Sequence, residues 1–288
     1  MKIIHISDTH IGAPHAAERL SSLIADIRRM TEGAEKWVVV HTGDLIDREA
    51  PEYHPTALEL IRELQPDDGS ARLPFLLVPG NHDYGRSWRI DRDRAAAFRE
   101  AFAEHIFGDQ PAQFPVLHVM DGCAFIGLDS SAAEFGILKG LFAEGELGQD
   151  QLDRLNRLLD DPKLAGLYKV VYLHHHPFID SYAIRPDIGD RHFFSKLYSW
   201  YGRGRLRLKD ANSLLQILRD RVDLLLFGHK HYGLDHRFEA QRYGLGMALD
   251  ASSSTAQGMD TDRMRYRVID VQSGDVSVRT VLIPPASL

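Results

Sequence analysis

The stretch Ile3-Ile4-His5-Ile6-Ser7-Asp8-Thr9-His10 passes from a short apolar segment directly into two side chains that can bind metal. Four further segments repeat this arrangement, in which an apolar run ends in a polar motif. They are Val38–Val40 before Gly43-Asp44, Phe75–Val78 before Gly80-Asn81-His82-Asp83, Val170–Leu173 before His174-His175-His176-Pro177, and Leu224–Phe227 before Gly228-His229-Lys230-His231. Such runs predict buried strands. We therefore expect all five motifs at the carboxyl ends of strands, where open α/β sheets place their binding sites.

The motifs supply oxygen and nitrogen ligands but no thiolate. The candidate metal ligands are Asp8, His10, Asp44, Asn81, His174, His229 and His231. This set suits Mn, Fe, Zn or Co better than Ca or Mg. Asp-x-His and His-x-His put alternate side chains on one side of an extended backbone, so the members of each pair are expected to converge. Seven ligands complete two four-coordinate sites only if one carboxylate bridges, and a bridged pair about 3.5–4 Å apart is the known two-metal hydrolytic arrangement.

Helical patterns alternate with the predicted strands. Apolar residues at three- and four-residue spacing predict helices over 16–30, 91–107, 148–160 and 210–220. Residues 237–283 instead show strand-like alternation with a turn at 272–275, which predicts antiparallel strands closing the second sheet. The sequence therefore predicts an α/β fold, a four-layer α-β-β-α sandwich of two mixed sheets flanked by helices. The metal motifs reach from near the start to about four-fifths of the 288 residues, so we expect a single domain over 1–288.

Composition narrows the class of protein. A hydrophobic content of 44% is enough for a large core, and a formal net charge of -7 disfavours a nucleic acid as partner because nucleic-acid binders usually carry a basic surface. Cys123 is the only cysteine, which excludes an intrachain disulfide and favours a reducing compartment. No apolar signal region precedes the first motif, and no segment is long and apolar enough to span a bilayer. We expect a cytoplasmic protein.

The series Asp-x-His, Gly-Asp, Gly-Asn-His-Asp, His-x-x-Pro and Gly-His-x-His, spread over residues 3 to 231, resembles the calcineurin-like metallophosphoesterases. The opening Met-Lys-Ile-Ile-His-Ile-Ser-Asp-Thr-His and the closing Phe-Gly-His-Lys-His are most similar to the class III cyclic nucleotide phosphodiesterases. The nuclease branch of the family has a similar start. The resemblance implies the same sandwich fold and a centre of two divalent or mixed-valence transition metal ions, with Mn and Fe favoured.

Position by position, the resemblance implies a role for each motif. It assigns Asp8, His10, Asp44 and His231 to the first metal, and Asp44, Asn81, His174 and His229 to the second, with Asp44 as the bridge. His82 matches the catalytic histidine that reaches the scissile phosphate without binding metal. Asp47 matches an aspartate that orients that histidine. Arg48 could contact phosphate, although a surface arginine is an equal interpretation.

Three consecutive histidines occur where the family pattern uses one. The proline at 177 selects His174, and His175 is expected to face away while the strand persists, because adjacent strand residues point to opposite sides. His176 could point the same way as His174, and it is kept as a neighbour on the substrate side. Histidines outside the motifs, among them His236, are expected to be surface or satisfied polar residues.

The expected reaction is hydrolysis of a phosphodiester, of the cyclic nucleotide or the glycerophospho or lipid-headgroup type. Two cations would neutralise the phosphate oxygens and lower the pKa of a bridging water, and the resulting hydroxide would attack in line. His82 would lie beside the leaving oxygen. A DNA exonuclease and a phosphomonoesterase are the enzymatic alternatives. The alternative outside catalysis is a metal-stabilised scaffold that binds a partner.

The stretch 178–209 between two motifs is too polar and irregular for an ordinary sheet connection. It is rich in arginine and aromatic residues, and long insertions beside sites often act as lids or specificity loops. Such a mixture could stack a base and hold phosphate, or bind an anionic membrane surface or a nucleic acid strand. A surface loop with solvated charges or an oligomer contact is the plain alternative.

Overall fold

Parallel strands at the centre of each sheet bring the five motifs to one side of the molecule. The computed structural model describes residues 1–33, 36–48, 50–64, 73–86, 89–132, 144–178, 208–231, 233–256, 263–272 and 275–284. Within this part of the chain, two five-stranded sheets carry the fold, and a small sheet pairs β4 (Gly85–Arg86) with β5 (Arg89–Ile90).

The first sheet has the strand order β12-β11-β1-β2-β3. Its strands are β1 (Lys2–Ile6), β2 (Trp37–His41), β3 (Phe75–Leu77), β11 (Met264–Gln272) and β12 (Asp275–Ile283). β1, β2 and β3 run parallel, whereas β11 is antiparallel to β1 and β12 to β11. The carboxyl ends of β1, β2 and β3 therefore meet at one edge, and the first three motifs follow them directly.

The second sheet has the strand order β10-β9-β8-β7-β6. Its strands are β6 (Val116–Met120), β7 (Cys123–Gly127), β8 (Tyr168–Tyr172), β9 (Leu224–Phe227) and β10 (Met247–Asp250). β7 to β10 run parallel and only β6 is antiparallel. The last two motifs therefore follow neighbouring parallel strands.

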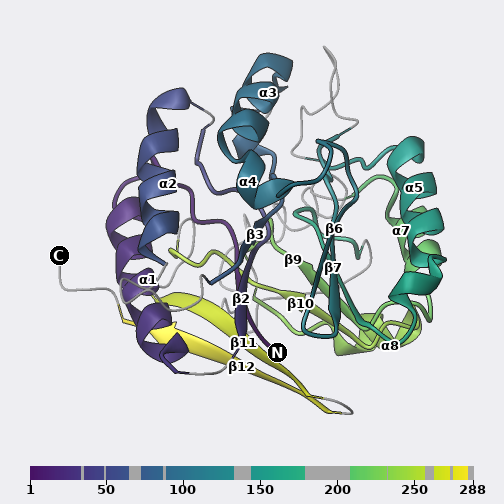
Figure 1. Ribbon diagram of the computed structural model, residues 1–288. Helices are drawn as coiled ribbons and strands as arrows, with labels where there is room; N and C mark the ends of the chain where they lie inside the picture. The colour runs from purple at the N-terminus through teal and green to yellow at the C-terminus, as the bar shows by residue number, and fades with distance from the viewer. Residues whose placement is uncertain are drawn as a thin grey trace, which may run out of the picture.

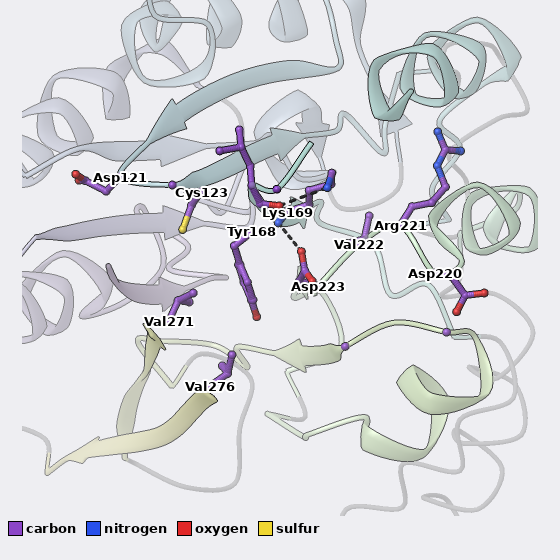
Figure 2. Close-up of a pocket in the computed structure, with 15 residues that line it drawn as sticks. Asp121, Cys123, Tyr168, Lys169, Asp220, Arg221, Val222, Asp223, Val271 and Val276 are labelled. Atoms are coloured by element: carbon purple, nitrogen blue, oxygen red, sulfur yellow. Dashed lines mark hydrogen bonds between the residues drawn. The ribbon is translucent and has the colours of Figure 1, made fainter. Parts of the chain in front are cut away.

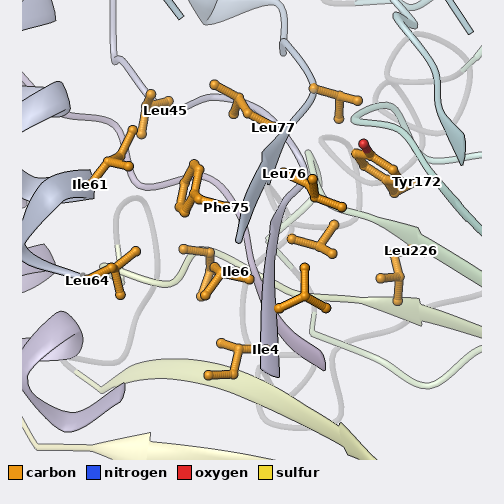
Figure 3. Close-up of a cluster of buried hydrophobic side chains, with 14 of the residues drawn as sticks. Ile4, Ile6, Leu45, Ile61, Leu64, Phe75, Leu76, Leu77, Tyr172 and Leu226 are labelled. Carbon is orange, nitrogen blue, oxygen red and sulfur yellow. The ribbon is translucent and has the colours of Figure 1, made fainter. Parts of the chain in front are cut away.

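Both faces of the central part of the second sheet are buried, which explains why β7 and β9 are continuously apolar. In β8, Val170 and Tyr172 belong to the core shared with the first sheet, while Val171, together with Leu173 just after the strand, belongs to a second core. This alternation is the period of two that strand geometry imposes. Figure 3 shows Tyr172 and Leu226 of the second sheet in the same cluster as Ile4 of the first.

Helices flank the outer faces of both sheets and one end of the sandwich (Figure 1). They are α1 (Ala16–Thr31), α2 (His54–Glu63), α3 (Arg92–Ala101), α4 (Ala103–Ile106), α5 (Gln149–Leu159), α7 (Ala211–Leu218) and α8 (Arg237–Arg242), with single 3₁₀ turns at Pro51–Tyr53, His82–Tyr84 and Pro162–Leu164. Helix α1 buries Leu23 and Ile27 in the core of the first sheet, and α5 buries Leu155 in the core outside the second. The predicted sandwich is confirmed.

The prediction of antiparallel strands over residues 237–283 was wrong in part. Residues 237–242 form a helix, and β10 extends the second sheet as a parallel strand. The antiparallel pair β11 and β12 does exist, but it joins the first sheet beside β1 instead of closing the second. Strand pairing over more than 200 residues of separation depends on packing that a local pattern does not contain.

Within the described residues, no helix combines the length and apolarity that a bilayer span needs.

Candidate dimetal site

Three predicted ligands form a first cluster where β1 and β9 end. Asp8 follows β1, His231 follows β9, and His231 Nε2 lies 3.0 Å from Asp8 Oδ1. His10 Nε2 lies 3.3 Å from His231 Nε2 and 4.0 Å from the same carboxylate oxygen. The three ligand atoms all lie within 4.8 Å of one another. Two imidazoles and a carboxylate thus converge as the Asp-x-His and His-x-His motifs predict.

A second cluster forms where β8 ends. His174 Nε2 lies 3.1 Å from His229 Nδ1 and 3.2 Å from Asn81 Oδ1. Asp44 Oδ2 is 3.2 Å from the same His174 nitrogen. The other ring nitrogen, His174 Nδ1, donates to the carbonyl of Thr42 at 2.8 Å, and such a bond fixes the orientation and tautomer of a metal-binding histidine.

Asp44 connects the two clusters, since its ligand oxygen lies within 4.8 Å of those of Asp8 and His174. Each of these carboxylates uses one oxygen to accept from the backbone. Asp8 Oδ2 accepts from His229 N at 3.0 Å, and Asp44 Oδ1 accepts from His82 N at 2.9 Å. The second oxygen of each is left facing a cluster. The mixed donor set and this convergence fit two transition metal ions bridged by Asp44.

The predicted ligands converge because the backbone turns at each motif. The extended backbone that the sequence predicted for the Asp-x-His and His-x-His motifs was wrong. Asp8, His10, Asp44, His229 and His231 have φ angles of 52, 50, 53, 76 and 55 degrees. These values lie in the left-handed region, where Asp, Asn and His are the side chains best tolerated after glycine. Each strand ends before its motif begins, so the alternation of an extended chain no longer applies. Strained backbone of this kind clusters at functional sites.

Two glycines in the motifs are required by close approach of neighbouring motifs. A Cβ at Gly80 would lie 2.1 Å from Asp44 Oδ1, and a Cβ at Gly228 would lie 2.1 Å from Ser7 Oγ and 2.4 Å from Asp8 Oδ2. Real Cβ atoms do not approach other atoms so closely. These glycines therefore let the Asp44 and Asp8 carboxylates occupy their positions.

The electrostatics keep both carboxylates ionised in the absence of metal. Burial alone would raise the pKa of Asp8, but the adjacent His231 lowers it to about 2. Burial opposes ionisation of Asp44 as well, and His174 nonetheless lowers its pKa well below the usual range. Two buried carboxylates that stay charged attract cations, which is what a metal centre needs.

His82 lies at the edge of the first cluster, with its side chain 22% exposed. Its Nδ1 donates to the backbone carbonyl of Asp47, and its ring centroid is 4.9 Å from that of His10. The Asp47 carboxylate is 3.5 Å from His10 Nδ1 and 3.8 Å from His82 Nδ1. Asp47 therefore lies between a predicted ligand and the predicted catalytic histidine. Arg48 is 71% exposed and pairs with Asp47 at 3.5 Å, so it lies at the surface next to the site.

The histidines after His174 occupy other places than expected. His175 follows the end of β8, and its ligand atom lies within 4.8 Å of those of His174 and His229, so it does not face away from the second cluster. Its Nδ1 is 2.7 Å from Ser130 Oγ. His176 was expected on the substrate side, and this is wrong, because its ring is fully buried against Phe178 and His236. Both differences arise because the strand stops at Tyr172.

Two sets of supporting residues were missed from the sequence. Buried Asp83 accepts from Gly80 N at 2.8 Å and from Ile46 N at 2.9 Å, which ties the second and third motifs together. Three hydroxyl side chains after β10 donate to the motif backbone: Ser253 Oγ to Asp8 O at 2.7 Å, Thr255 Oγ1 to Thr9 O at 2.9 Å, and Ser252 Oγ to His231 O at 2.9 Å. An apolar run ending in a polar segment, the signal used for the five motifs, also marks Met247 to Thr255.

A cavity of about 980 Å³ lies at the other end of the second sheet. Its lining includes Tyr168 and Lys169 at the start of β8, and Val222 and Asp223 just before β9 (Figure 2). Lys169 N donates to Asp223 Oδ2 at 2.7 Å. The motifs follow the carboxyl ends of these strands, so this cavity is separate from the metal clusters.

The sequence predicts that the stretch 178–209 acts as a lid. Residues 179–207 of this stretch lie outside the described part of the chain.

Solved structures share this fold at low sequence identity. A dimetal phosphatase from Danio rerio is 14% identical, with a TM-score of 0.61 and coverage of 99% of this chain and 99% of that chain. GAP50 of Plasmodium is 14% identical, with a TM-score of 0.59 and coverage of 98% and 84%. A putative 5'-nucleotidase from Staphylococcus aureus is 12% identical, with a TM-score of 0.54 and coverage of 98% of this chain and 54% of that chain.

At these identities the likeness shows the fold. No curated protein matches the chain. The family model of the calcineurin-like phosphoesterases matches residues 1–233. Because this match covers most of the chain and takes in all five motifs, the chain belongs to the calcineurin-like phosphoesterase family.

Proposed function

We propose that this phosphoesterase hydrolyses small phosphodiesters, of the cyclic nucleotide or the glycerophospho or lipid-headgroup type. The observation that carries catalysis is the convergence of two ligand clusters on Asp44, with His82 beside them. The preference for diesters is supported by the opening and closing motifs, Met1 to His10 and Phe227 to His231, which resemble those of class III cyclic nucleotide phosphodiesterases.

In this proposal the ligands divide as the geometry groups them. Asp8, His10 and His231 would hold the first metal, Asn81, His174 and His229 the second, and Asp44 would bridge. When bound, two such ions, with Mn and Fe favoured, neutralise phosphate oxygens and lower the pKa of a bound water.

The residues around the metals would position the reaction. His82 donates its Nδ1 proton to the Asp47 carbonyl, so Nε2 is the ring atom left for the substrate. As an imidazolium ion, His82 would give its Nε2 proton to the leaving oxygen and become the neutral ring with its proton on Nδ1. The Asp47 carboxylate would orient the His10 ring, because its oxygen lies 3.5 Å from His10 Nδ1 and 3.8 Å from His82 Nδ1. Arg48 would contact phosphate only after leaving its pair with Asp47.

The test is hydrolysis of bis(p-nitrophenyl) phosphate and p-nitrophenyl phosphate by protein stripped of metal and reloaded with Mn²⁺. Faster turnover of the diester that requires metal supports the proposal. Preference for the monoester would replace it with a phosphatase. Asp44→Ala should retain neither metal nor turnover, because it removes the shared ligand, and an active Asp44→Ala protein would contradict the assignment of the bridge.

Two other functions give different outcomes in the same assays. Turnover of single-stranded or duplex DNA above that of small diesters would indicate the nuclease alternative, which the net charge of -7 disfavours. Retention of two metals without turnover of any ester would indicate a binding scaffold.

We also propose a single domain over 1–288, because both sheets contribute ligands. We propose a reducing, cytoplasmic location, because Cys123 is the only cysteine and is buried.

A further inference from the structure

A third group of metal-binding side chains lies outside the two catalytic clusters. It consists of His176 after β8, His236 before α8 and Asp250 at the end of β10, and we refer to it as the buried triad. The exposed fractions of these residues are 0%, 3% and 0%. Their ligand atoms lie within 4.8 Å of one another, the limit that the first catalytic cluster also satisfies.

One ligand-type atom of each triad residue is buried and has no hydrogen bond to any of the residues that the structure describes. These atoms are His176 Nε2, His236 Nε2 and Asp250 Oδ2. A buried polar atom without a partner destabilises the fold, so three such atoms in one place are unfavourable unless something binds them. We propose that the buried triad is a third cation site, which takes a first-row transition-metal dication such as Zn²⁺.

The geometry of the triad resembles that of the proposed catalytic ligands. The rings of His176 and His236 are 4.8 Å apart with an interplanar angle of 79°, and those of His174 and His229 are 4.9 Å apart with an angle of 77°. Asp250 Oδ1 accepts from Ser252 N at 2.7 Å, and this leaves Oδ2 for the triad. Asp8 and Asp44 divide their oxygens in the same way between a backbone N–H and a metal cluster.

The surroundings of His236 favour binding of a metal ion through its Nε2. Its Nδ1 faces the Glu239 carboxylate at 3.8 Å, and a carboxylate behind a histidine is the usual support for a zinc ligand. Burial lowers the pKa of His236 to about 4, so the ring is neutral at pH 7 and keeps a lone pair for a metal.

His176 requires a change of tautomer. Its Nδ1 accepts from Phe178 N at 3.3 Å, so in the neutral ring the proton is on Nε2. Binding a metal at Nε2 would move that proton to Nδ1 and give up this long hydrogen bond. The binding of a structural zinc ion is much more favourable than the loss of one hydrogen bond is unfavourable.

The charges around the triad leave room for a dication. Asp250 lies near Lys230, Arg267 is already paired with Asp235, and Glu239 lies next to His236. Two imidazoles and one carboxylate, with a fourth position for water, form a ligand set that zinc accepts.

The experiment compares metal content in the full-length protein and two histidine variants. Each protein is saturated with Zn²⁺, desalted and measured by inductively coupled plasma mass spectrometry. We expect one zinc ion fewer per chain in His236→Gln than in wild type, with phosphoesterase turnover within about threefold. His118→Gln is the control, because His118 is a partly buried histidine that bonds the Ile106 carbonyl and belongs to no cluster. It should bind as much zinc as wild type.

Equal zinc content in His236→Gln and wild type would overturn the proposal. Anomalous diffraction from zinc-loaded wild-type crystals at the zinc edge gives an independent answer if the variant does not fold. A peak between His176, His236 and Asp250 supports the site, and a water there without anomalous signal overturns it. The readout is independent of the proposed catalysis, because the catalytic clusters can fail to bind or to turn over while the difference at the triad persists.

Discussion

Replacing Gly80 with alanine should displace the bridging ligand without touching any metal-binding side chain. The new Cβ would lie 2.1 Å from Asp44 Oδ1 and 2.4 Å from Asp44 N. To reach even 3.0 Å, the carboxylate oxygen must move by about 0.9 Å. Metal sites tolerate deviations of about 0.2 Å in ligand distance, so both metals would lose Asp44 in its proper position.

We expect Gly80→Ala to bind the two metals at least about 100-fold more weakly, since even changes outside the ligand set cost roughly 10- to 100-fold. Crowding should also destabilise the protein by about 1–3 kcal/mol. Gly166→Ala is the matched control: Gly166 has a φ of 75 degrees, and no atom of the described residues lies within 4 Å of an added Cβ. It should lose about 1–2 kcal/mol through backbone strain and keep its metals.

The assays are metal content after equilibration with Mn²⁺, turnover of bis(p-nitrophenyl) phosphate, and urea unfolding of all three proteins. A Gly80→Ala protein that retains two metals and near wild-type turnover would refute the argument from close packing. A protein that loses stability but not metal would show that the Gly80 backbone moves instead of the Asp44 carboxylate.

Three further changes test other parts of the site. His82→Ala should keep its metals and lose about 10²–10⁴-fold in turnover, because only proton transfer is removed, and full activity would contradict this role. Ser253→Ala should destabilise the protein by about 1–3 kcal/mol in urea unfolding, because the buried Asp8 carbonyl loses its hydrogen-bond donor. It should also weaken binding of the first metal. An unchanged free energy of unfolding would contradict this role of Ser253. Chelated protein should lose stability as the pH falls below 6.5, because burial lowers the pKa of His41 to about 3 and of His236 to about 4, so the unfolded chain binds more protons. Each histidine contributes about 1.4 kcal/mol per pH unit between 6.5 and its folded pKa, and a urea midpoint that is the same at pH 6.5 and 5.0 would contradict this.

The sequence predicted local structure well wherever a single segment carried the signal. The run Ile3–Ile6 becomes β1, and the pattern over 16–30 becomes α1 at Ala16–Thr31. Helix α2, His54–Glu63, was missed, although it begins with a proline in its first turn and buries Leu60 and Ile61 on one face. Its amphipathic pattern is as regular as that of the others, so the signal was available.

Long-range arrangement was harder to predict because it depends on packing between segments that the chain separates widely. β11 pairs with β1 across more than 250 residues, and no local pattern in Met264–Gln272 distinguishes one sheet from the other. His176 was misplaced for a related reason, since its direction depends on where β8 stops. The serines after Asp250 bond backbone atoms, and any hydroxyl residue could serve, so their identity carried little information.

The left-handed backbone at the ligands indicates that the protein itself shapes the site. Five non-glycine residues in this region cost at least about 1 kcal/mol each, a sum comparable to the whole stability of many domains. Hydrogen bonds within the fold offset part of this cost, since His229 N and His82 N bond the Asp8 and Asp44 carboxylates and Ser252 and Ser253 hold the loops. Relaxing any one of these loops would release strain and separate the ligands. The same contacts that bring the carboxylates together therefore also keep them from moving apart before a metal binds.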